Sequence, residues 1–107
     1  MSRENHGCYR VDRAPQVFLS FETPRERRAL PYALLVDLEI ATDSTLLKIV
    51  FSHYEVFVRG SQMDAVYESV RSASCAAIFP GTPGADDSRK DVASVVEIRI
   101  KRLNSPD

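Results

Sequence analysis

The sequence predicts an α+β fold in two layers, an antiparallel sheet of four or five strands packed on one helix in the order β-β-β-β-α-β. Two observations lead to this prediction. Apolar and polar residues alternate along several segments, as they do in a strand whose side chains repeat every two residues. One later segment instead has apolar residues three and four positions apart, which is the spacing of a helix face. The 107 residues suit one domain.

The alternating segments predict the strands in order along the chain. Residues 1–14 show no periodicity, so we expect a flexible N-terminus followed by a single domain over 15–103. The segment 23–31 has a proline near each end and is rich in arginine, which indicates a connection. Strands are predicted at 16–22, 32–42, 46–52, 55–59 and 92–103.

The alternation also assigns the strand residues to two faces of the predicted sheet. Charged residues such as Asp37, Glu39 and Lys48 share one face, where opposite charges can pair across neighbouring strands. We therefore expect that face to be solvated. The other face is apolar and is predicted to pack on the helix. Its members are Leu34, Val36, Leu38, Ile40, Leu47, Ile49, Phe51, Val56, Val58, Val96, Ile98 and Ile100.

The helix is predicted to follow Gly60. Ser61 is the expected N-cap, because a serine hydroxyl can accept a hydrogen bond from a free N–H of the first helical turn. Asp64 would face the positive end of the helix dipole. Prolines and charges predict an exposed loop at 80–91, and the tail 104–107 is expected to be exposed. The apolar stripe of the helix consists of Met63, Val66, Tyr67, Val70, Ser74 and Ala77.

The composition is that of a small soluble protein without a strong charge preference. Hydrophobic residues make up 44% of the chain, charged residues make up 27%, and the net charge is −1. These values give no general attraction to nucleic acid or to an acidic membrane. No apolar run is long enough to span a bilayer, and the N-terminus lacks the apolar segment of a secretory signal. We therefore expect a cytoplasmic protein without membrane contact, in which Cys8 and Cys75 are free thiols.

A first candidate site lies where the strand 55–59 meets the predicted helix. His53 and Tyr54 precede this strand, and Ser61 follows it at the expected helix start. Backbone N–H groups at a helix start attract anions, so a small anion or metabolite binder is one alternative function. The cysteines and histidines lack the spacing of a metal site. We expect no catalytic residue, no metal and no cofactor, and favour a protein that is not an enzyme.

A second candidate surface is the arginine-rich segment before the second strand. Arg25, Arg27 and Arg28 form a basic cluster that could contact phosphates. Glu22 and Glu26 dilute this charge, and the outer face of the predicted sheet carries few aromatic residues on which bases could stack. Nucleic-acid binding is therefore an alternative function and not the preferred one.

The preferred function comes from apolar residues on the predicted outer face of the sheet. Phe57, Val50 and Val95, with Leu35 beside them, would form a patch that a monomer rarely leaves exposed. The last strand, or the strand 16–22, could also be an unpaired edge that adds another chain. The sequence therefore predicts a protein-interaction module that forms a homodimer or binds another protein.

Overall fold

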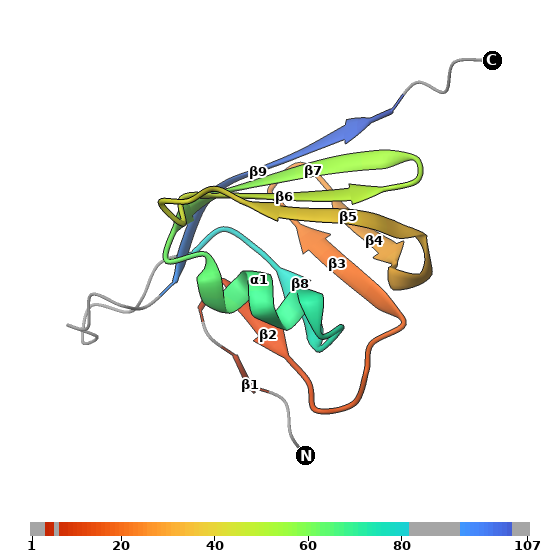
Figure 1. Cartoon of the computed structure of the whole chain (residues 1–107), viewed down its shortest axis with the longest axis horizontal. Helices are drawn as coiled ribbons and strands as arrows, with labels where there is room; N and C mark the ends of the chain where they lie inside the picture. Colours follow the sequence, from red (N-terminus) through yellow and green to blue (C-terminus); the bar gives the residue numbers. More distant parts are fainter. Residues whose placement is uncertain (1–3, 6, 82–92, 104–107) are drawn as a thin grey trace.

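The chain folds into two β-sheets and one α-helix. The computed structural model describes residues 4–5, 7–81 and 93–103. Figure 1 shows that the helix and the five-stranded sheet lie on the same side of the four-stranded sheet. The prediction of a mixed α+β fold is confirmed, but a single sheet covered by a helix is wrong, because a second sheet supplies much of the cover. No helix within the described ranges is long and apolar enough to cross a membrane.

The four-stranded sheet contains the strands that the alternation predicted best. Every neighbouring pair in it is antiparallel. Residues Ser52 and His53 form the short turn between its second and third strands. In spatial order the strands are β5 (Leu35–Ile40), β6 (Leu46–Phe51), β7 (Tyr54–Ser61) and β9 (Ser94–Arg102).

The five-stranded sheet was not predicted as a separate layer. Its neighbours are antiparallel except β3 and β8, which run parallel. β1 and β2 lie in the segment predicted to be flexible, and β4 lies in the predicted connection. A short 3-10 helix, η1 (Tyr32–Leu34), leads from this sheet to β5. In spatial order the strands are β1 (Glu4–Asn5), β2 (Tyr9–Val11), β8 (Cys75–Ile78), β3 (Phe18–Glu22) and β4 (Arg27–Pro31).

The helix α1 (Asp64–Arg71) is shorter than its apolar stripe suggested. It does not continue to Ala77, because Ala73 has a left-handed backbone with φ of 61° and the chain turns there into β8. The expected cap is also wrong, since Ser61 ends β7 and Met63 holds the N-cap position without a side-chain hydrogen bond. Most of the predicted loop 80–91 and all of the tail 104–107 lie outside the described residues.

The core lies between the two sheets and the helix. Phe21 of β3 and Phe51 of β6 meet edge to face across it, with ring centroids 6.2 Å apart. Burial of each such side chain stabilises the fold by roughly 1.5–3 kcal/mol. The largest fully buried side chains come from both sheets and the helix, namely Phe21, Phe51, Leu19, Leu47, Ile49, Met63, Ile78, Val56, Val58, Val66, Val70 and Val95.

Two irregularities move apolar residues away from their predicted faces. The register of β5 against β6 shifts between Leu35 and Asp37, and Val36 is 65% exposed as a result. The register of β9 against β7 shifts beside Gly60, and Val96 is 66% exposed. An extra residue of this kind reverses the side-chain alternation on one side of it. Leu34 is also exposed, because it belongs to η1 and not to a strand.

Candidate functional site

The most distinctive surface feature of the described chain is the free edge of β9. This strand pairs with β7 along its length from Tyr54↔Arg102 to Ser61↔Ser94. Its other edge has one partner among the described residues, a single bridge between Gly81 and Val95. Among the residues that the structure describes, no strand therefore lies beside the stretch from Val96 to Arg102. A row of unpaired backbone groups of this kind can receive another strand.

The hydrogen-bond pattern identifies the backbone groups that face this edge. Just beyond β9, the Leu103 N–H donates to the His53 carbonyl at 2.9 Å. In an antiparallel pair, residues that bond to the neighbouring strand alternate with residues that point away from it. Counting back from Leu103, Lys101 and Arg99 bond to β7. The N–H and C=O groups of Ile98 and Ile100 consequently point toward the free edge.

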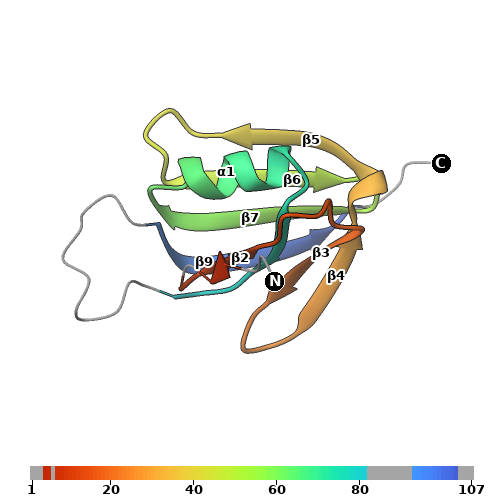
Figure 2. The ribbon, with the colours of Figure 1, turned by 90° about the horizontal axis from the view of Figure 1, so that it is seen from below.

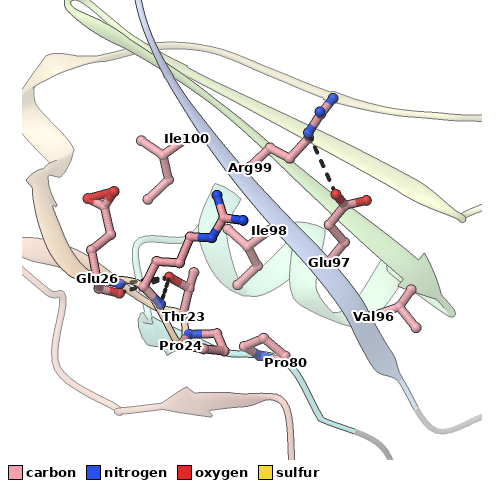
Figure 3. Close-up of a pocket in the computed structure, with 10 residues that line it drawn as sticks. Thr23, Pro24, Glu26, Pro80, Val96, Glu97, Ile98, Arg99 and Ile100 are labelled. Atoms are coloured by element: carbon pink, nitrogen blue, oxygen red, sulfur yellow. Dashed lines mark hydrogen bonds and ion pairs between the residues drawn. The ribbon is translucent and has the colours of Figure 1, made fainter.

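A groove runs along this edge, and we call it the β9 groove. Its volume is about 550 Å³. One wall is β9 itself, and the opposite wall is the turn between β3 and β4, with Pro80 at one end (Figure 3). Figure 2 shows the β3–β4 hairpin extending past β9, beyond the edge of the four-stranded sheet. The lining residues are Thr23, Pro24, Arg25, Glu26, Pro80, Val96, Glu97, Ile98, Arg99 and Ile100.

The turn that forms the far wall is held by one side chain. The Thr23 hydroxyl accepts hydrogen bonds from the N–H groups of Arg25 at 3.2 Å and Glu26 at 3.0 Å. The Thr23 N–H donates to the Glu26 carbonyl at 2.8 Å. Threonine commonly closes turns in this way. The hairpin therefore presents Pro24 and Arg25 to the groove from a hydrogen-bonded turn.

The two faces of β9 differ in chemistry. Ile98 and Ile100 project toward the hairpin turn, whereas Glu97 and Arg99 project to the opposite side (Figure 3). Glu97 is already engaged, because the Arg59 guanidinium donates to its carboxylate at 2.7 Å and Arg99 lies 3.6 Å from it. Such exposed pairs contribute little to stability.

Basic side chains outnumber acidic ones along the unpaired stretch of β9 and on the hairpin turn that faces it. Glu26 pairs with Arg28 at 2.9 Å. Within the described part of the chain, the side chains of Arg25, Lys101 and Arg102 have no ion pair. The groove therefore has the aliphatic side chains of Ile98 and Ile100 on the inner face of β9, and basic side chains on both β9 and the hairpin turn.

The residues of the predicted anion site are not brought together. His53 and Tyr54 lie at one end of β7 and Ser61 at the other, about 23 Å away at ~3.3 Å per residue. The Ser61 hydroxyl forms a hydrogen bond with the Ser94 hydroxyl at 2.8 Å. Tyr54 accepts a hydrogen bond from Arg28 at 2.9 Å, and that guanidinium also lies over its ring. These residues do not form one pocket.

The predicted apolar patch is only half present. Phe57 and Val50 are half-buried on the outer face of the four-stranded sheet, as expected. Val95 is 1% exposed and belongs to the core, and Leu35 packs partly against the core. The same two register shifts explain both errors, because each reverses the alternation near its residue. Phe57 instead lines a small depression with Leu46 and Arg99.

The three arginines of the nucleic-acid alternative have different surroundings. Arg25 lines the β9 groove, and Arg27 is exposed at the start of β4. Arg28 is used by Glu26 and Tyr54, so its guanidinium is not free for a phosphate. Nucleic-acid binding stays an untested prediction.

Cys8, Cys75 and Tyr32 are poorly suited to act as catalytic groups. Burial raises the pKa of the Cys8 and Cys75 thiols to about 11, so both are neutral at physiological pH and poor nucleophiles. Burial likewise raises the pKa of the Tyr32 hydroxyl, which donates to the Cys75 carbonyl at 2.7 Å. Among the described residues, no three His, Cys, Asp or Glu side chains are placed to hold a metal ion.

The β9 groove could have been suspected from only part of its sequence. Thr23-Pro24 begins the segment 23–31, which is predicted to be a connection, and 92–103 is predicted to be a strand. Nothing in the sequence places that connection beside that strand, because they belong to different sheets. No known protein family, curated protein or solved structure matches this chain.

Proposed function

We propose that this chain is a small, non-enzymatic protein-interaction module that binds an extended segment of another polypeptide beside β9. The observation that carries the proposal is the free edge of β9, where Ile98 and Ile100 turn their backbone groups toward an open groove. Strand addition to an exposed sheet edge is a common mode of peptide recognition, in which backbone hydrogen bonds supply affinity.

The dimensions of the groove fit a single strand. A strand added to a sheet lies about 4.8 Å from its neighbour. At that distance from β9 it would lie over the β3–β4 hairpin, which extends past this edge (Figure 2). The free stretch from Val96 to Arg102 allows about seven paired residues, or about 23 Å. The hairpin would cover the inner side of the incoming strand and leave its outer side in solvent.

The surroundings support binding in preference to chemistry. The carboxylates of the groove, Glu26 and Glu97, each form an ion pair with an arginine. The two buried cysteines are free thiols, as suits a reducing compartment such as the cytoplasm. An open sheet edge with a groove beside it and paired charges suits a recognition module.

Amide hydrogen exchange tests the proposal directly. Peptides selected from a random display library against the whole protein are added at saturation, and exchange is followed by two-dimensional NMR. We expect slower exchange at Ile98 and Ile100, because their N–H groups would gain partners. The N–H groups of Arg99 and Lys101 serve as an internal control, since they already bond to β7. Selected peptides that protect another surface and leave Ile98 and Ile100 unchanged would show that the function has been misplaced.

A further inference from the structure

We infer that the segment bound in the β9 groove is acidic, with aspartate or glutamate at alternate positions opposite Arg99 and Lys101 and aliphatic residues between them. This inference rests on the proposed function and specifies its partner. It follows from the alternation of β9, because directly opposed residues of an antiparallel pair lie on the same face. The charges on β9 therefore dictate the charges of its neighbour.

The outer face of β9 favours negatively charged residues in the bound segment. Arg99 is largely exposed, with 76% of its side chain accessible, and its contact with Glu97 is long at 3.6 Å. Lys101 has no ion pair among the described residues, since the facing Glu55 is held by Lys48 at 3.3 Å. Carboxylates opposite Arg99 and Lys101 would each meet a cation that lacks a close partner.

The inner face of the same strand favours aliphatic residues in the bound segment. Ile98 and Ile100 are half-buried beside β7 and border the groove. Residues opposite them would face Pro24 and the aliphatic stem of Arg25 on the hairpin turn. Burying a charged side chain there without a partner would be costly. An acidic and aliphatic alternation thus satisfies both sides of the groove.

A second copy of this chain fits the same edge less well. Pairing two β9 strands with Glu97 opposite Arg99 of the second copy would place Lys101 of that copy opposite Val95. That position is already taken by Gly81, which exchanges two hydrogen bonds with Val95 at 2.9 and 2.8 Å. A register shifted by two residues keeps each side chain on the same face of the paired strands. It avoids Gly81, but it places Arg99 of one copy opposite Arg99 of the other. Like charges directly opposed are destabilising.

Synthetic peptides can test the charge and the binding mode separately. The probe is a fluorescently labelled, end-blocked Val-Glu-Val-Glu-Val peptide, titrated into the full chain and followed by anisotropy. The charge control replaces both glutamates with lysine. Two further peptides carry N-methyl groups on the valines or on the glutamates. In the expected register the valine N–H groups bond to β9 and the glutamate N–H groups point away.

We expect the glutamate peptide to bind about tenfold more tightly than the lysine peptide, with the difference shrinking at high salt. N-methylation of the valines should abolish binding, and N-methylation of the glutamates should not. The double variant Arg99→Glu with Lys101→Glu should reverse the charge preference. Its circular dichroism spectrum establishes that it is folded, and the peptide comparison on the wild-type chain does not depend on it.

The other outcomes separate the two proposals. If the glutamate and lysine peptides bind equally and both need free valine N–H groups, strand addition stands and the acidic preference is wrong. If neither binds, or if methylating the valines has no effect, both proposals are wrong. If the wild-type chain dimerises and the peptide competes with dimer formation, the occupant is a second copy and the acidic partner is excluded.

Discussion

At the scale of single residues, Gly60 in β7 has no room for a side chain. A β-carbon on this residue would lie 1.9 Å from the Ser94 carbonyl oxygen, at the register shift between β7 and β9. We therefore expect Gly60→Ala to lower the free energy of unfolding by about 1–3 kcal/mol, because the backbone of β9 must move away. Urea denaturation followed by circular dichroism measures this loss.

The neighbouring residue provides the control for Gly60. Ser61 is exposed, and its hydroxyl lies 2.8 Å from the Ser94 hydroxyl. Ser61→Ala should change the free energy of unfolding by no more than about 0.5 kcal/mol, as is usual for exposed positions. A helix cap at Ser61 would instead be worth about 1 kcal/mol. A loss at Ser61 as large as that at Gly60 would contradict this assignment of the two residues.

Single residues also account for most of the errors made from sequence. The apolar alternation in 32–42 and 92–103 shows no break in the sequence. In the structure, however, Val36 and Val96 are extra residues, and each reverses the alternation. A bulge is set by how two strands pair, so one strand read alone does not reveal it. This is why Leu35 and Val95 were assigned to the outer face and Val36 to the inner face.

At the scale of elements, the entry to α1 is strained where Gln62 adopts φ of 55°. Glycine takes this left-handed conformation without the steric cost that other residues bear. We expect Gln62→Gly to raise the free energy of unfolding by about 0.5 kcal/mol, as measured by thermal and urea denaturation.

The same substitution inside the helix should have the opposite sign. Ala65 is exposed in the first turn of α1. Ala65→Gly should therefore lower the free energy of unfolding by about 0.5–1 kcal/mol, because glycine loses more backbone freedom in a helix. If both glycine variants were destabilised alike, Gln62 would not carry the strain described here.

The two sides of β9 can be distinguished by proline. Lys101 and Arg102 are adjacent, basic and exposed, but only the Lys101 N–H points toward β7 in the alternation counted from Leu103. Lys101→Pro should lower the free energy of unfolding by about 1–3 kcal/mol, because the paired Glu55 carbonyl loses its donor. Arg102→Pro should cost much less, since proline is tolerated where an edge N–H faces solvent. Equal losses in urea denaturation would overturn the assignment of the free edge.

The elements differ in how visible they were in the sequence. β5, β6, β7 and β9 were recognised because each has one buried and one solvated face. The helical spacing of Val70, Ser74 and Ala77 extends the predicted helix into the segment Cys75–Ile78, which forms β8. This segment is a central strand with partners on both sides, and short apolar runs do not separate strand from helix by periodicity.

At the scale of the whole molecule, the second sheet is explained by the shortness of α1. Its eight residues span about 12 Å at ~1.5 Å per residue. The four strands of the sheet are about 14 Å apart from first to last at ~4.8 Å per neighbour, and β9 alone is about 30 Å long. One short helix leaves much of that apolar face uncovered. β3, β4 and β8 bury the remainder, and the overhang of their hairpin creates the β9 groove.

The oligomeric state is a property of the whole molecule that the β9 edge should decide. The register that avoids Gly81 opposes two Arg99 side chains, so we expect the wild-type chain to be monomeric in sedimentation velocity. Arg99→Val removes that repulsion and leaves an aliphatic edge from Ile98 to Ile100, so this variant should self-associate with rising concentration. Lys101→Val is the matched control, because Lys101 faces Glu97 of the second copy in that register and its loss gives no relief. A wild-type dimer, or identical behaviour of the two valine variants, would show that Arg99 does not keep this edge open.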